Sequence, residues 1–325
     1  MNERRKLLIA MGAVALTTPL VAVAQTQGAK PARIGILGPG SAATNAGFLA
    51  ALLAELRALG YVEGKNIALE PRWSETALDR LPALAAQLVG LKVDAIVASQ
   101  TPSAQAAKQA TASIPIIMAG VADPVASGLI ASLARPGGNV TGLSGATSDL
   151  AAKTLELLRD MLPATKRVGV LANSADPFSK VFVEHVELAG RHLGINLMIV
   201  KVRGEEGLEA AFEEIAKAKA SAIIMQPSLP LKRACDLAIK YRLASASPWN
   251  AFADNGGLLA YAANSAERFR SIAFYVDKIL KGAKPADLPV QQPTRFEMIV
   301  NLKTAKAIGL TVPEGFLARA DKVIE

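Results

Sequence analysis

Cysteine and histidine are almost absent from this sequence, which has one cysteine, Cys235, and two histidines among its 325 residues. A single thiol cannot close an intramolecular disulfide, and no Cys/His cluster exists that would hold a structural zinc ion. His185 and His192 lie seven residues apart on one predicted helix and match no metal motif. We therefore expect no metal and no cofactor, and a fold stabilised by its hydrophobic core.

Aromatic residues make up only 5% of the chain, and its 25 glycines and 18 prolines are scattered. With 51% hydrophobic residues, this composition excludes disorder, collagen-like repeats and coiled coil. The net charge of +8 is spread over lysines and arginines interspersed with acidic residues, so we predict no nucleic-acid partner. The sequence also has no Walker loop, no G-x-S-x-G elbow and no H-E-x-x-H motif, and nothing in it requires an enzyme.

Long apolar runs are missing except at the start of the chain. There Arg4–Lys6 forms a basic segment, Leu7–Val23 is nearly all apolar, and Ala22-Val23-Ala24 fits the small-x-small rule of signal peptidase. We predict a signal peptide over residues 1–24, cleaved after Ala24, and a periplasmic location. The adjacent arginines are also compatible with twin-arginine export, so the sequence leaves open which export route is used.

From Arg33 onward, short β-rich runs alternate with segments of helical period. This alternation predicts parallel sheets with helices on both faces, and its restart after residue 148 predicts two similar α/β domains. The expected strands are 33–37, 67–73, 94–98, 114–119, 139–144, 167–171, 197–202, 222–226, 244–247, 258–262 and 296–301. The expected helices are 49–59, 78–89, 102–111, 124–133, 150–161, 177–193, 207–218, 231–241, 265–280 and 304–308. The strands and helices predicted from residue 258 onward fit best if the chain crosses between the two domains more than once.

Short polar residues and one tryptophan follow the predicted strands, where ligands bind in open α/β sheets. Each residue alone is more typical of a turn or a helix cap, but the set predicts a small polar ligand held in a cleft between the domains. The candidate binding residues are Gly40, Ser41, Gln100, Thr101, Asp123, Asn173, Ser174, Gln226, Trp249 and Asn250.

Hydrogen-bond donors predominate among the first-domain candidates, so we expect that domain to bind an anionic or carbonyl end of the ligand. The loop at Gly40 and Ser41 would supply N–H groups, and Thr101 a hydroxyl. Asp123 is either an acceptor for the ligand or the cap of the predicted helix that begins at Pro124. Trp249 would pack on the apolar body of the ligand.

The segment from Gly38 to Ala43 matches G-x-G-x-x-A between a predicted strand and a predicted helix. A two-domain enzyme with a cofactor on the Gly38–Gly40 loop is therefore one alternative. Against it, the next strand ends in Pro71-Arg72-Trp73 and carries no acid placed for a ribose. We favour a loop that attracts a carboxylate.

Several longer motifs resemble one family, the ABC-transporter substrate-binding proteins of the TrpX-like group. The matching segments are 60–66 (Gly-Tyr-Val-Glu-Gly-Lys-Asn), 110–116, 123–125, 132–143 (Ser-Leu-Ala-Arg-Pro-Gly-Gly-Asn-Val-Thr-Gly-Leu), 155–158, 279–289 and 301–305. The resemblance covers essentially the whole chain after residue 24. It implies a type I periplasmic-binding fold, in which two doubly wound domains joined by three crossovers close on a ligand.

This resemblance implies an N-terminal ligand-binding domain of residues 25–145 plus 256–288 and a C-terminal one of residues 146–255 plus 289–325. It also implies a monomer that delivers its ligand to an ABC permease in the inner membrane, or a sensor subunit as the alternative. Pro227–Pro230 stands where relatives often carry an acid that would bind a ligand ammonium. The ligand is thus either amino-acid-like or an aromatic or carboxylate compound.

Overall fold

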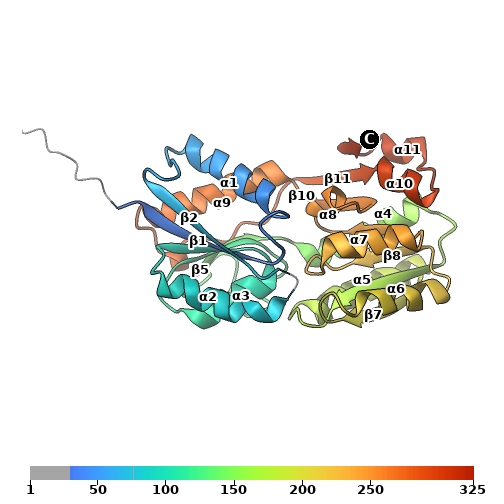
Figure 1. Cartoon of the computed structure of the whole chain (residues 1–325), viewed down its shortest axis with the longest axis horizontal. Coiled ribbons are helices and arrows are strands. Elements are labelled where there is room, and N and C mark those ends of the chain that lie inside the picture. Colours follow the sequence, from blue (N-terminus) through green and yellow to red (C-terminus); the bar gives the residue numbers. More distant parts are fainter. Residues whose placement is uncertain (1–29, 76) are drawn as a thin grey trace, which may run out of the picture. The chain divides into compact units, whose positions relative to one another are not determined.

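Two β-sheets form the framework of the computed structural model, which describes residues 30–75 and 77–325 (Figure 1). Residues 31–325 form one compact unit with two lobes, each built around one sheet. The sheet of the first lobe has the order β2-β1-β3-β4-β5, and all its strands are parallel. Its strands are β1 (Ala32–Gly38), β2 (Ile67–Trp73), β3 (Ala95–Ala98), β4 (Ile116–Val121) and β5 (Val140–Ser144).

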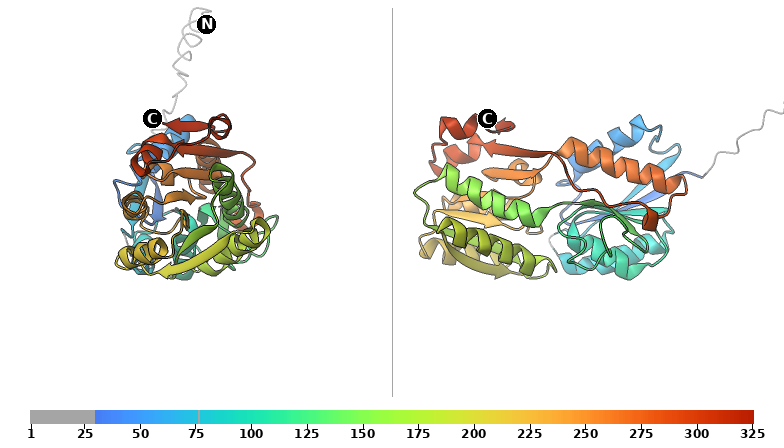
Figure 2. Two further views of the ribbon diagram at one scale, coloured as in Figure 1. Left: turned by 90° about the vertical axis from the view of Figure 1, so that its right-hand side faces the viewer. Right: turned by 180° about the vertical axis from the view of Figure 1, so that it is seen from behind.

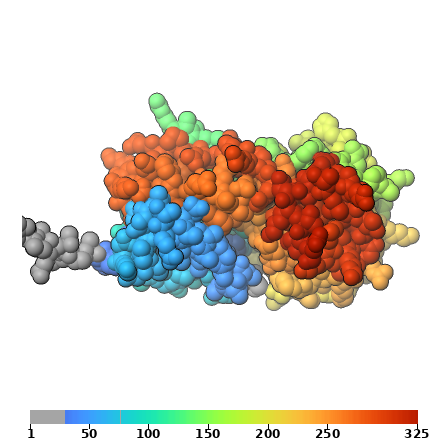
Figure 3. Space-filling model, turned by 90° about the horizontal axis from the view of Figure 1, so that it is seen from above, coloured from blue at the N-terminus to red at the C-terminus, as the bar shows by residue number. Residues whose placement is uncertain are grey.

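Helices cover both faces of the first sheet, as the alternating pattern predicts. They are α1 (Ala46–Ala58), α2 (Leu81–Gly90), α3 (Gln100–Ala110) and α9 (Ser265–Leu280), with short 3-10 turns η2 (Leu78–Arg80) and η3 (Pro285–Asp287). Leu56 of α1 and Ile272 of α9 pack together on one face, and Figure 3 shows these two helices side by side in blue and orange. Leu88 of α2 and Ala104 of α3 pack on the other face. The central strands are consequently buried on both sides.

The second lobe contains a sheet of order β12-β11-β10-β9-β8-β6-β7. Only β10 and β11 pair antiparallel within it, a departure from the expected all-parallel sheet. Its strands are β6 (Arg167–Asn173), β7 (Asn196–Val202), β8 (Ala222–Met225), β9 (Ala244–Ser247), β10 (Leu259–Ala263), β11 (Phe296–Asn301) and β12 (Lys322–Ile324). Its helices are α4 (Thr147–Met161), α5 (Ser179–Leu193), α6 (Leu208–Lys217), α7 (Leu231–Lys240), α8 (Ala251–Asp254), α10 (Leu302–Ile308) and α11 (Glu314–Leu317). Phe182 of α5 packs on one face of the sheet and Phe212 of α6 on the other.

Within the part of the chain that the structure describes, the backbone crosses between the lobes three times, as a type I periplasmic-binding fold requires (Figure 2). It leaves the first lobe after β5, returns with α9, and leaves again before β11. Neighbouring crossings are joined by backbone hydrogen bonds from Ser144 N to Gln291 O and from Asn264 N to Arg295 O, each 2.9 Å long. These bonds hold the crossings together in one narrow region.

The return crossing lies later in the chain than the predicted boundary at residue 256. Strand β10 pairs with β9 and β11 in the second sheet, so it does not belong to the first lobe. Val290 packs in the core of the first lobe and Gln291 bridges to Leu143 of β5, so the last boundary also lies after residue 288. The alternation of strands and helices along the sequence does not indicate which of the two sheets a strand such as β10 joins.

The helix predicted over residues 124–133 is absent, and this segment is a series of turns. Asp123 Oδ1 accepts hydrogen bonds from Val125 N at 3.1 Å and Ala126 N at 3.0 Å, which closes a turn at the start of the segment. The short elements α8, α11 and β12 were not predicted, because four residues are too few to show a helical period and three are too few to show the alternation of a strand.

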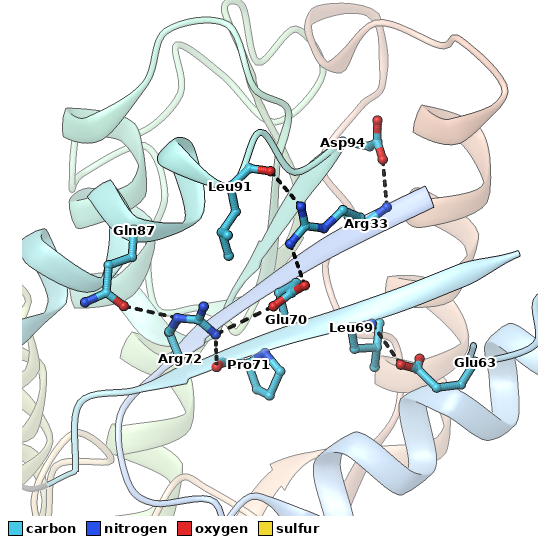
Figure 4. A network of polar contacts seen from close by, with 9 residues as sticks. All are labelled: Arg33, Glu63, Leu69, Glu70, Pro71, Arg72, Gln87, Leu91 and Asp94. Atoms are coloured by element: carbon cyan, nitrogen blue, oxygen red, sulfur yellow. Dashed lines mark hydrogen bonds and ion pairs between the residues drawn. The ribbon is translucent and has the colours of Figure 1, made fainter. Parts of the chain in front are cut away.

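A cluster of charged residues covers the outer part of the first sheet (Figure 4). Glu70 on the edge strand β2 accepts a 2.7 Å hydrogen bond from Arg33 of β1 and lies 3.8 Å from Arg72. Arg72 also donates to Gln87, 3.1 Å away. Charged side chains on an edge strand discourage pairing with other chains, so we assign this cluster a structural role.

None of the helices in residues 30–75 and 77–325 is long and apolar enough to span a membrane. The predicted signal peptide, residues 1–24, lies wholly outside the described part of the chain.

Candidate functional site

The two lobes face each other across a cleft of about 610 Å³. It lies beyond the carboxyl ends of β1, β3, β8 and β9, where an open α/β sheet places its ligand. The first lobe contributes Pro39, Gly40, Ser41, Thr44, Asn45, Gly47, Phe48, Glu75, Leu78, Ser99, Gln100, Ser265, Arg268 and Phe269 to its lining. The second lobe contributes Glu205, Pro227, Ser228, Leu229, Pro230, Leu231, Lys232, Arg233, Asp236, Trp249, Asn250, Ala251, Asp254 and Asn255. Gly40, Ser41, Gln100, Trp249 and Asn250 are thus the predicted site residues that the fold brings together.

The loop after β1 is braced by its own hydrogen bonds. Gly40 N donates to Glu75 O at 3.0 Å, Ser41 N to Thr44 Oγ1 at 2.9 Å, and Thr44 N to Ser41 Oγ at 3.3 Å. Gly40 has a φ of +77°, and a Cβ there would lie 2.7 Å from Thr44 Oγ1, so the turn favours glycine. Since these three N–H groups already have acceptors, the loop does not offer them to a carboxylate or a cofactor phosphate as the sequence suggested.

Gln100 reaches from the first lobe toward the second. Its Nε2 lies 3.5 Å from Pro227 O, while its Oε1 is buried and has no partner among the described residues. Its φ of +65° is in the left-handed region, which is unfavourable for a non-glycine residue. An acceptor held without a partner in a strained conformation is typical of a group that awaits a ligand.

Aromatic rings and one arginine form the part of the cleft nearest the crossings. The guanidinium Cζ of Arg268 lies 4.7 Å from the ring centre of Trp249 and 5.0 Å from that of Phe269. Phe48 meets Phe269 edge-on at 5.5 Å. Burial lowers the pKa of Arg268 to about 10, while the charge of Glu297 acts in the opposite direction, so the guanidinium stays charged at neutral pH. Within residues 30–75 and 77–325, Arg268 makes no ion pair.

Asn250 is held by a carboxylate behind the cleft. Its Nδ2 donates to Glu297 Oε1, and its Oδ1 is buried without a partner in the described structure. Glu297 also accepts from Asn264 Nδ2 at 3.0 Å and from Ser265 N and Oγ at 3.2 Å each. Because the amide nitrogen is engaged, the carbonyl oxygen of Asn250 is left available to a ligand.

The other predicted residues have structural contacts instead. Thr101 is 2% exposed, and its hydroxyl accepts from Ala122 N at 3.3 Å. Asp123 closes the turn described above, and the hydroxyl of exposed Ser174 donates to Val202 O. Asn173 and Gln226 belong to a buried hydrogen-bond network. None of the five residues named in this paragraph lines the cleft, and their contacts stabilise the structure around it.

That network is centred on Asp176. Asp176 Oδ2 accepts from Gln226 Nε2 at 2.6 Å, and Gln226 Oε1 accepts from Asn173 N at 2.9 Å. Asn173 Nδ2 donates to the carbonyl oxygen of Ser228, which lines the cleft. Burial raises the pKa of Asp176, and hydrogen bonds to its carboxylate oppose that shift. The network therefore positions the loop after β8.

Sequence reasoning missed Arg268, Phe269 and Phe48. All three lie on helices, whereas the candidate residues were drawn only from the segments that follow predicted strands, although an arginine in the first turn of α9 was a detectable signal. His185 is half-buried and His192 exposed on α5. The described residues hold no group of three or more His, Cys, Asp or Glu side chains that could bind a metal ion.

Comparison with known proteins adds the following. The model of the family described as ABC transporter substrate binding protein matches residues 34–324. A tyrosine-binding protein of Clostridioides difficile is 29% identical over 77% of this chain and 73% of its own. The structure of an ABC domain in complex with L-Trp from Streptococcus pneumoniae is 27% identical, covering 91% of this chain and 100% of that one, with a TM-score of 0.81. A conserved domain protein from Vibrio cholerae is 28% identical, covering 90% and 100%, with a TM-score of 0.82.

Proposed function

Because the chain belongs to the family of ABC transporter substrate-binding proteins, we propose that it captures one small solute in its cleft and delivers it to a permease in the inner membrane. Proteins of this family are solute-binding receptors rather than enzymes. The proposal places this chain in the periplasm as a monomer, after cleavage of residues 1–24.

The observation that supports the cleft as the binding site is a set of buried polar atoms without partners. Gln100 Oε1, Asn250 Oδ1 and Arg268 Nε all belong to residues of the cleft lining, and each is buried and unsatisfied within the described structure. An unsatisfied buried polar atom costs roughly 1–3 kcal/mol, so such atoms rarely gather without a reason. A ligand that hydrogen-bonds to them would remove that cost.

The aromatic lining indicates the kind of ligand. Trp249 is contributed by the second lobe, and Phe48 and Phe269 by the first, so a flat apolar body would contact both lobes. Two of the similar proteins are named for tyrosine and for a complex with L-Trp. We infer an amino-acid-like, aromatic or carboxylate solute of similar size.

Closure of the lobes would follow from contacts made to both at once. The crossings near residues 145, 264 and 293 would bend, and the permease would recognise the closed form. Hydrogen exchange with and without ligand should show protection at these crossings, together with a small contraction in solution scattering.

A thermal-shift screen of amino acids, aromatic acids, sugars and nicotinamide cofactors tests this function, and native mass spectrometry of the purified protein identifies any retained ligand. Binding of a solute should raise the melting temperature by an amount that grows with its concentration. We expect the nicotinamide cofactors to produce no shift, since the loop after β1 uses its own N–H groups. A chain that binds no solute by either method would not be a receptor. N-terminal sequencing of exported protein should begin at Gln25.

A further inference from the structure

Arg268 differs from the other charged residues that line the cleft. The other six are all exposed. They are one lysine, one arginine and four acidic residues: Glu75, Glu205, Lys232, Arg233, Asp236 and Asp254. Arg268 is half-buried, its Nε is fully buried without a partner among the described residues, and its guanidinium lies over two aromatic rings. The interior of the cleft therefore presents a cation, and its carboxylates lie at the rim.

The position of Arg268 on its helix is itself unfavourable. It lies in the first turn of α9, where the helix dipole is positive and acidic residues are preferred. The carboxylate of Glu297 is the charge that favours ionised Arg268, yet both its oxygens already accept hydrogen bonds from Asn250, Asn264 and Ser265. A guanidinium kept at this place without an ion pair leaves its donors unpaired with any carboxylate, and it can form that pair with an anion.

We infer that the cleft binds an aromatic carboxylate that carries no ammonium group beside the carboxylate, with the carboxylate held by Arg268. An α-amino acid places its ammonium on the carbon next to its carboxylate. Beside Arg268 and the start of α9, that ammonium would meet a second positive charge and the positive end of a helix. The unsatisfied acceptors there are neutral, and the one carboxylate behind them, Glu297, already accepts hydrogen bonds at both oxygens. A ligand without the ammonium avoids this repulsion and keeps the ion pair.

The unpartnered acceptors predict a second feature of the ligand. The amide nitrogens of Gln100 and Asn250 are directed to Pro227 O and Glu297, so their buried carbonyl oxygens face a donor that the described protein does not supply. A neutral hydroxyl or ring N–H on the aromatic body satisfies such an oxygen without adding charge. Hydroxylated aromatic acids should accordingly bind more tightly than the plain ones.

This inference rests on the proposed receptor function and sharpens it, and three matched pairs of compounds test it. They are 3-phenylpropanoate against phenylalanine, 3-(4-hydroxyphenyl)propanoate against tyrosine, and indole-3-propanoate against tryptophan. Each pair differs only in the ammonium. Calorimetry on the mature protein should show each acid binding at least about tenfold more tightly than its amino acid, and the methyl ester of each acid should lose that binding.

Variants of α9 test the role of Arg268. Arg268→Gln should weaken binding of the acids by about tenfold or more, whereas Arg270→Gln, an exposed position on the same helix, should leave it unchanged. Melting temperatures of both variants establish that they fold. If Arg268→Gln does not fold, Arg268→Lys should keep the preference for acids over esters with weaker binding.

Tighter binding of the amino acids, or no binding of any of the three acids, would overturn the ligand class. Binding of some other solute in the thermal-shift screen would then leave the receptor function standing.

Discussion

The guanidinium of Arg268 lies over the indole ring of Trp249, with Cζ 4.7 Å from the ring centre. Arg268 belongs to α9 of the first lobe, and Trp249 follows β9 of the second. A cation–π contact of this kind is worth about 0.5–2 kcal/mol, depending on its solvent exposure. The two lobes are therefore already in contact at the residues that line their cleft, and a ligand there would meet a prepared surface.

Replacing Trp249 by alanine should weaken ligand binding by about 2 kcal/mol, roughly thirtyfold, because the ligand loses its main flat contact and Arg268 loses its support. The dissociation constant can be measured by calorimetry, with the melting temperature as a check on folding. Phe274→Ala, an exposed aromatic on α9 that is 40% accessible, is the matched control and should bind normally. Equal affinity of the two variants would place the ligand elsewhere.

Thr101→Ala should reduce the free energy of unfolding by about 1 kcal/mol and leave the ligand affinity within about twofold. The hydroxyl of Thr101 accepts from Ala122 N inside the first lobe, so its loss leaves that N–H buried without an acceptor. Denaturant unfolding and calorimetry measure the two effects, and Thr101→Ser should restore stability. A tenfold loss of affinity at unchanged stability would instead show that Thr101 contacts the ligand.

Asp176 should make the protein less stable as the pH rises above the ordinary value of this group's pKa, 3.8. Its pKa is raised in the folded state, so between the unfolded and folded values the native protein binds more protons than the unfolded chain. The stabilisation that Asp176 contributes is fully present below its pKa in the unfolded chain. It is lost as the pH rises through its higher pKa in the folded protein. Urea unfolding from acid to neutral pH should show the parent losing stability relative to Asp176→Asn. A constant difference would contradict the raised pKa.

Gly142→Ala should destabilise the first lobe by about 3 kcal/mol or more. Gly142 has a φ of +119°, and a Cβ there would lie 2.5 Å from the backbone N and O of Met118 on β4. Gly64→Ala is the control, because Gly64 also has a positive φ of +77° but nothing within 4 Å of the added atom. We expect the control to lose only about 1 kcal/mol by thermal unfolding. Similar losses would mean that the strain of the φ angle, rather than the contact, decides the cost.

Most of the fold could be predicted because the apolar periods of strands and helices are clear in this chain. Strands such as Ile67–Trp73 and helices such as Ser265–Leu280 lie where their patterns indicate. Errors arose where the pattern carries no information, namely the sheet that β10 joins and the turns that follow Asp123. The sheet that β10 joins depends on pairing partners that are distant in the sequence, and the turns depend on single hydrogen bonds.

About half of the candidate site was located from strand ends alone. Strand order places Gln100 and Trp249 at the edge that borders the cleft, but it does not say whether the next side chain points into the cleft or into the lobe. Thr101, directly after Gln100, points inward to Ala122. Arg268 and Phe48 enter from helices, and their rotation about the helix axis is settled only by packing.

The interleaving of the two lobes along the chain also sets the order in which the protein can be completed. One apolar face of the first sheet is covered only in part, by α1, until Ile272 and Val276 of α9 are made, after the strands β6 to β10 of the other lobe. The second lobe in turn lacks β11 and β12 until the last thirty or so residues. During synthesis, therefore, neither lobe is completed alone: a chain stopped before residue 265 has all five strands of the first sheet but lacks the α9 cover, and its second sheet lacks β11 and β12.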